Sequence, residues 1–156
     1  EIRNCDWSSD VCSSDLKLGY TCGLLSTVVN KIADRIIPST HTTPDAVQLQ
    51  SLLHQMVQAG CTHAFMEVSS HAVVQHRISG VHFRGGIFTN ITHDHLDYHG
   101  TFENYLAAKH GFFKSLSSDS FALVNMDDEN GSAIGSDLKL RAQTYGFSQE
   151  IGRAHV

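Results

Sequence analysis

The chain has 156 residues, a length typical of one domain, and a formal net charge of −5 from 11 Lys and Arg against 16 Asp and Glu. This acidic balance argues against a protein that wraps nucleic acid with a basic surface, and no apolar run reaches the roughly 18 residues of a membrane-spanning helix. Four cysteines in a chain of this length do not make a disulfide scaffold, whereas the 11 histidines point to metal or phosphate chemistry.

Residues 1–16 and 149–156 do not share the pattern of the middle. One codon choice for the last six residues, Ile-Gly-Arg-Ala-His-Val, has a reverse complement that translates as Asp-Val-Cys-Ser-Ser-Asp, the sequence of residues 10–15. Unrelated ends of a protein have no reason to be reverse complements. We therefore expect residues 1–16 and 149–156 to be translated sequencing adapter, and residues 17–148 to be the native part of a domain.

The first predicted element is a strand over residues 22–29, with which residues 31–37 pair as a hairpin. A helix is predicted to start at Thr43-Pro44-Asp45, with Thr43 as N-cap, Pro44 at the first helical position and Asp45 in the first turn. Gly60 is its predicted stop. The apolar residues at helical spacing in between are Val47, Leu49, Leu52, Leu53, Met56 and Val57.

The second half of the chain continues this alternation of strands and helices. Residues 63–68 and 86–89 are predicted as buried strands, and residues 121–125 and 143–147 as two more. Between them Thr101 opens a helix whose apolar residues are Phe102, Tyr105, Leu106, Phe112, Phe113 and Leu116. Strands that alternate with helices at this spacing predict βαβ units, and therefore an α/β fold of three layers around a mostly parallel sheet without an internal domain boundary.

Two polar segments follow predicted strands at their carboxyl ends, where ligands bind in open parallel sheets. The first is EVSSH, which starts at Glu67, and the second is TNITHDHLDYH, residues 89–99. A carboxylate at one strand end and imidazoles at the next can converge on one cation, and a few hard oxygen ligands favour Mg²⁺. Glu67 and three polar residues outside these segments, Thr42, Thr43 and Lys109, also have ordinary explanations. Glu67 could be a solvated loop charge, Thr42 and Thr43 could serve only as a helix cap, and Lys109 could be a surface lysine.

Four segments together carry a specific resemblance. THTTPD (40–45), MEVSSHAVVQHR (66–77), FTNITHDHLDYHGTFENYLAAK (88–109) and ALVNMDDENG (122–131) resemble the central domain of the Mur ligase family. Within that family they resemble the branch that adds the third amino acid to UDP-N-acetylmuramoyl-L-alanyl-D-glutamate. The resemblance runs through essentially all of residues 17–148, and it implies a truncated form of the family's P-loop-NTPase-like α/β domain.

The resemblance implies roles for individual residues. Glu67 and His95 would bind Mg²⁺, and a carbamylated Lys109 would hold a second Mg²⁺, which makes these three the catalytic set. Asn90 would support the phosphates of ATP. The residues implied to hold the nucleotide-sugar dipeptide are Thr42, Thr43, Ser69, Gln75 and Arg77.

The resemblance also implies a reaction and its partners. In the family mechanism, the D-Glu carboxylate attacks the γ-phosphate of ATP, and the amine of meso-diaminopimelate or L-lysine displaces phosphate from the acyl phosphate. The implied enzyme is a monomer of the bacterial cytoplasm that serves peptidoglycan synthesis, binds ATP and Mg²⁺, and has no nucleic-acid or membrane partner.

One motif of the family does not occur in the sequence. No G-x-x-x-x-G-K-[ST] is present, although the family's P-loop should precede residues 17–20. Since that loop holds the β- and γ-phosphates, we expect this chain to be inactive by itself. Two other interpretations stay open. One is a non-catalytic nucleotide-sugar-binding module; the other is a metal-dependent hydrolase, because HDHLDYH resembles the H-x-H-x-D-H signature, although Tyr98 breaks its spacing.

Overall fold

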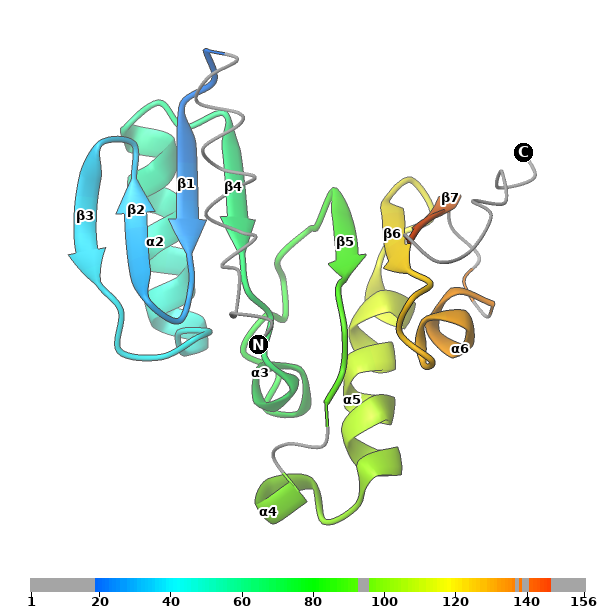
Figure 1. Cartoon of the computed structure of the whole chain (residues 1–156). Helices are drawn as coiled ribbons and strands as arrows, with labels where there is room; N and C mark the ends of the chain where they lie inside the picture. The colour runs from blue at the N-terminus through cyan, green and yellow to red at the C-terminus, as the bar shows by residue number, and fades with distance from the viewer. Residues whose placement is uncertain (1–18, 93–95, 137, 139–140, 147–156) are drawn as a thin grey trace. The chain divides into compact units, whose positions relative to one another are not determined.

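The computed structural model describes residues 19–92, 96–136, 138 and 141–146. The predicted adapter-derived ends, 1–16 and 149–156, lie outside these residues. Contacts divide the chain into two compact units, Glu1–Ser79 and Gly80–Val156, each of which is described by itself (Figure 1). None of the helices formed by the described residues has the length and apolar character needed to span a bilayer.

Unit 1 contains a four-stranded sheet of order β3-β2-β1-β4. Its strands are β1 (Cys22–Leu25), β2 (Val29–Ile32), β3 (Arg35–Pro38) and β4 (His63–Met66). β1 pairs antiparallel with β2 and β2 antiparallel with β3, whereas β1 pairs parallel with β4. The prediction of one strand over 31–37 was wrong, because the chain reverses after Ile32, with Ala33 at a positive φ of 52°, and continues as a separate strand.

Helix α2 (Ala46–Gln58) lies against one face of this sheet (Figure 1). Its N-cap is Asp45 and not Thr43 as predicted: the Asp45 carboxylate accepts hydrogen bonds from the backbone of Val47 and Gln48, each at 2.9 Å. The predicted stop is confirmed, because Gly60 has a positive φ of 76° and donates to the Val57 carbonyl just beyond the helix end.

The apolar face of α2 is narrower than predicted. Leu49 and Met56 are buried, and Met56 packs directly over Gly23 of β1. In contrast, Val47 and Val57 are exposed over 82% and 68% of their surface. Only the residues that face the sheet therefore contribute to the core of unit 1.

The strand predicted as buried over 63–68 is shorter and more exposed than expected. β4 ends at Met66, and its first two residues, His63 and Ala64, are exposed. Within the described part of unit 1, β4 lies at the end of the sheet and pairs only with β1. A short helix, α3 (Ser70–Val74), follows it and begins at the N-cap Ser69.

Unit 2 contains a parallel sheet of order β5-β6-β7. Its elements are β5 (Gly85–Phe88), α4 (Leu96–His99), α5 (Phe102–Ser115), β6 (Phe121–Asn125), α6 (Gly131–Gly135) and β7 (Arg141–Tyr145). Helix α5 begins where predicted, with the Thr101 hydroxyl accepting from the Asn104 backbone at 3.2 Å. Phe112 and Phe113 of α5 pack over Gly86 of β5. The α/β class with a parallel sheet is confirmed, although β7 starts two residues before the predicted 143–147.

The two glycines at the ends of α6 make a matched test of packing. A Cβ on Gly131 would overlap the carbonyl oxygen of Asn125, whereas a Cβ on Gly135 would meet only Val124 methyl groups at 3.9 Å. Gly131→Ala should lower the free energy of unfolding by about 1–3 kcal/mol, because backbone atoms of β6 must shift. Gly135→Ala should change it by less than about 1 kcal/mol. Urea unfolding followed by circular dichroism measures both, and equal losses would contradict this packing.

Candidate functional site

The parallel pairing of β1 with β4 sets the position of the candidate site in unit 1. Leu25 is in register with Met66, so both strands end at the same edge of the sheet, and the Glu67 backbone N–H donates to the Leu25 carbonyl at 2.9 Å. The polar residues that follow each strand therefore meet there. This is the edge at which the sequence predicts ligand binding.

Glu67 is held at this edge by Thr27, a residue that the sequence motifs do not include. The backbone N–H of Thr27 donates to Glu67 Oε2 at 2.8 Å, and its hydroxyl donates to the same oxygen at 2.6 Å. The Thr27 hydroxyl also lies 3.0 Å from that of Thr42. No local signal identifies Thr27, because its partners are 15 and 40 residues away in the sequence.

Thr43 joins the loop before α2 to the segment 67–69 through its side chain. Its hydroxyl donates to the Glu67 carbonyl at 2.8 Å and accepts from the Ser69 backbone N–H at 3.0 Å. Thr43 is only 1% exposed. This hydroxyl is therefore engaged with the segment 67–69 and is covered from solvent, which explains why it does not cap α2.

Ser69, Gln75 and Arg77 lie along and just beyond α3. The Ser69 hydroxyl accepts from the Ala72 backbone at 3.2 Å and so caps this helix. Arg77 donates from Nε to Gln75 Oε1 at 2.8 Å and from Nη1 to the Thr43 carbonyl at 2.9 Å. These two hydrogen bonds, one to the end of α3 and one to the loop before α2, hold the guanidinium in one orientation.

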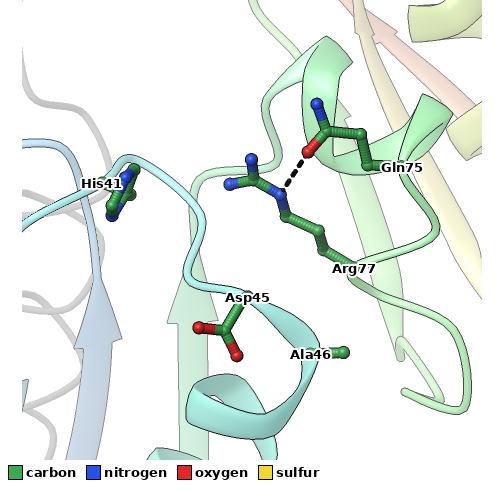
Figure 2. A pocket seen from close by; sticks show the side chains of 5 residues that line it. All are labelled: His41, Asp45, Ala46, Gln75 and Arg77. Atoms are coloured by element: carbon green, nitrogen blue, oxygen red, sulfur yellow. Dashed lines mark hydrogen bonds between the residues drawn. The ribbon is translucent and has the colours of Figure 1, made fainter.

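The guanidinium of Arg77 borders a pocket of about 460 Å³, lined also by His41, Asp45, Ala46 and Gln75. Figure 2 shows Arg77 turned toward Gln75 on one side of this pocket, with His41 and Asp45 across from them. A guanidinium fixed by neutral oxygens keeps its positive charge available to a ligand, and its planar N–H groups match a carboxylate or a phosphate. The pocket therefore presents one guanidinium suited to an anionic group, together with the Asp45 carboxylate, which accepts from the backbone of α2.

Unit 2 holds the remaining predicted residues. Asn90 is exposed, two residues beyond the end of β5. Lys109 lies on α5 with its Nζ 5.7 Å from the centre of the Tyr105 ring, a contact that favours a cation. His95 lies outside the described residues. The three predicted metal ligands are thus not brought together by any described contact, and that set stays a prediction.

Glu67 nevertheless fits a Mg²⁺ site. The ion commonly takes one or two protein carboxylates and completes its shell with water and phosphate oxygens. Within residues 19–92, 96–136, 138 and 141–146, no group of three or more His, Cys, Asp or Glu side chains could hold a metal ion. Among these residues the donor set at Glu67 consists of oxygens, from its own carboxylate and the nearby threonine hydroxyls, which suits a hard cation.

Two groups of unit 2 have displaced pKa values. The hydroxyl of Ser117 is the main cause that lowers the pKa of the Asp119 carboxyl below its usual value, and the charges of His82 and Arg84 add to this. Burial raises the pKa of the Tyr145 hydroxyl above its usual value. None of these residues is among the predicted site residues.

Replacing Thr43 tests the link between the loop before α2 and the segment 67–69. Thr43→Val keeps the shape of the side chain but leaves the Ser69 N–H and the Glu67 carbonyl without the partner that Thr43 supplies. We expect a loss of about 1–3 kcal/mol in the free energy of unfolding, since unpaired buried groups are costly. Thr42→Val, the same change at a half-buried neighbour, should cost less than about 1 kcal/mol. Comparable losses in the two variants, measured by urea unfolding, would show that Thr43 does not have this role.

Comparison with known proteins identifies the family of the chain. The family described as the Mur ligase middle domain matches residues 10–155. The UDP-N-acetylmuramoyl-L-alanyl-D-glutamate–2,6-diaminopimelate ligase of Cytophaga hutchinsonii is 59% identical over 129 residues, which are 83% of this chain and 26% of the relative. The ligase of the same name from Clostridium perfringens is 39% identical over 139 residues, 86% of this chain and 28% of the relative.

A solved structure of a protein with that ligase name is 32% identical and superposes with a TM-score of 0.78, covering 91% of this chain and 29% of the other. The chain spans about a quarter of the length of the curated relatives it matches. The family match and the relatives confirm the resemblance drawn from the four sequence segments. The chain belongs to the Mur ligase family, and it corresponds to the family's middle domain.

Proposed function

We propose that this chain is part of an ATP-dependent acid–amino-acid ligase of peptidoglycan synthesis. The reaction joins diaminopimelate to UDP-N-acetylmuramoyl-L-alanyl-D-glutamate, as the names of the relatives describe for those proteins. In it, the D-Glu carboxylate attacks the γ-phosphate of ATP, which forms an acyl phosphate and releases ADP; an amine of diaminopimelate then displaces inorganic phosphate and loses a proton to form the amide. L-Lysine, which the sequence left open as the added amino acid, finds no support among these relatives.

The observation that carries the proposal is the oriented guanidinium of Arg77 beside the pocket. The substrate bears a diphosphate and carboxylates, and Arg77 offers the bidentate geometry that such groups require. Its bonds to Gln75 and to the Thr43 carbonyl orient it before a ligand arrives, which lowers the entropic cost of binding. In this proposal Thr43 contributes by positioning Arg77 and Glu67, Gln75 lines the pocket beside Arg77, and Thr42 would also contact the ligand.

For ATP binding, the proposal assigns Glu67, His95 and Lys109 as ligands of Mg²⁺ and places Asn90 near the ATP phosphates. Bound Mg²⁺ would neutralise the charge that accumulates on the phosphates during transfer. Lys109 would contribute as a carbamate, formed with CO₂, which converts the ammonium into an anion. Its contact with the Tyr105 ring favours the cationic form, so the carbamate requires the metal to offset this preference.

Replacing Arg77 in a complete enzyme tests the substrate side. We would substitute the matched residues of this chain into the Cytophaga hutchinsonii ligase and measure amide formation at varied substrate concentration. Arg77→Lys keeps the charge but loses the planar fork, and we expect kcat/KM for the nucleotide-sugar dipeptide to fall about tenfold or more. Arg35→Lys, on an exposed arginine bonded to Gln55, is the matched control and should leave kcat/KM unchanged. An Arg77→Lys enzyme as active as the control would exclude this role.

The 156-residue chain alone should show no ligase activity. Its sequence contains no G-x-x-x-x-G-K-[ST] loop to supply the backbone cradle and lysine for the β- and γ-phosphates. We expect no phosphate release from ATP that depends on both the nucleotide-sugar dipeptide and diaminopimelate, whereas the chimeric enzyme should release phosphate with each amide formed. Clear turnover by the isolated chain, followed with a phosphate-release assay, would overturn this expectation.

A further inference from the structure

Thr27 donates two hydrogen bonds to one carboxylate oxygen of Glu67, although no motif includes it. Thr27 lies in the loop between β1 and β2, two residues beyond the end of β1. Glu67 lies one residue beyond the end of β4, the strand that pairs in parallel with β1. The sheet register therefore brings the two residues to the same edge.

The hydrogen of the Thr27 hydroxyl is committed to Glu67. A hydroxyl has one hydrogen, and two oxygens lie within reach of it: Glu67 Oε2 at 2.6 Å and Thr42 Oγ1 at 3.0 Å. The shorter distance is typical of a hydrogen bond to a charged carboxylate. The Thr42 hydroxyl is the alternative acceptor for the same hydrogen, at the longer distance. Thr27 therefore lies between Thr42 and Glu67, with its hydroxyl within hydrogen-bond distance of both.

The loop that presents Thr27 is itself held in place. Ser26 is completely buried, and its backbone N–H donates to the side chain of Asn30 at 3.3 Å. Its hydroxyl donates to the Val29 carbonyl at 2.8 Å, and its own carbonyl accepts from the Ser39 hydroxyl at 2.7 Å. Thr27 therefore has a defined position although it is itself exposed.

We propose that Thr27 is a positioning residue that orients the Glu67 carboxylate to bind a divalent cation. The inference rests on the proposed function, in which Glu67 is a metal ligand. A glutamate on a loop can adopt many rotamers, and two donors on one carboxylate oxygen select one of them before the cation arrives. Partners that orient a ligating side chain in this way commonly affect metal affinity by 10–100-fold.

The test uses the full 156-residue chain with Mn²⁺ as the probe. Mn²⁺ is a hard cation that oxygen ligands accept in place of Mg²⁺, and it broadens the NMR signals of nearby nuclei. In the unsubstituted chain we expect the backbone amide signals of Thr27, Glu67 and Ser69 to broaden as Mn²⁺ is added. Thr27→Val should require about tenfold or more Mn²⁺ for the same broadening.

Three further variants separate positioning from a merely structural role. Thr27→Ser keeps the hydroxyl and should restore the response of the unsubstituted chain. Thr62→Val makes the same change on an exposed threonine just before β4, at the opposite end of that strand, and should leave the response unchanged. Glu67→Gln should move the amide proton signal of Thr27 upfield, because a neutral acceptor replaces a charged one. This last measurement tests the contact itself even if Thr27→Val fails to fold.

The outcomes decide the proposal in either direction. Equal Mn²⁺ responses of Thr27→Val and the unsubstituted chain, no rescue by Thr27→Ser, an unmoved Thr27 amide in Glu67→Gln, or no broadening around Glu67 would each overturn it. Failure of the proposed function is recognised separately, by an inactive chimeric ligase. An active chimeric enzyme combined with a Mn²⁺ response that does not depend on Thr27 would reject the positioning role alone.

Discussion

The parallel pairing of β1 with β4 is the constraint on which the candidate site of unit 1 depends. Because Leu25 and Met66 are in register, the chain leaves both strands at one edge, and the residues that follow must share a small volume. Thr27 arrives from one strand and Glu67 from the other. A slip of one residue in this register would turn the side chains of β4 to the opposite face and separate the pair.

Thr43 brings a third part of the chain, the loop before α2, to the same edge of the sheet. Its hydroxyl bonds to the backbone on either side of Val68, and its carbonyl accepts from Arg77, so one buried residue connects the loop before α2, the end of β4 and the segment after α3. The carboxylate of Glu67 and the guanidinium of Arg77 are thereby held on one framework.

The predictions from sequence succeeded where the deciding interactions are local. The start of α5 at Thr101 and the end of α2 at Gly60 depend on groups within a few residues, and both were found at the predicted positions. The N-cap of α2 was predicted wrongly because two residues compete for it. Thr43 and Asp45 are both good caps by type, and the choice between them was made by the Glu67 carbonyl and the Ser69 N–H, which lie more than twenty residues away.

By itself, the sequence determined the α/β class, the family, and the residues of the polar segments 67–71 and 89–99. The periodicities of strands and helices and the family motifs are patterns among residues close together in the sequence, so they can be recognised without the structure. Only the tertiary structure decided that Thr43 is buried and engaged, that Arg77 is oriented by Gln75 and the Thr43 carbonyl, and that Thr27 holds Glu67. Apart from the bond between Gln75 and Arg77, which lie two residues apart, these contacts join different elements of the fold. The register of the sheet decides which residues become partners. Pairing between strands that are distant in the sequence sets this register, so no short stretch of sequence encodes it.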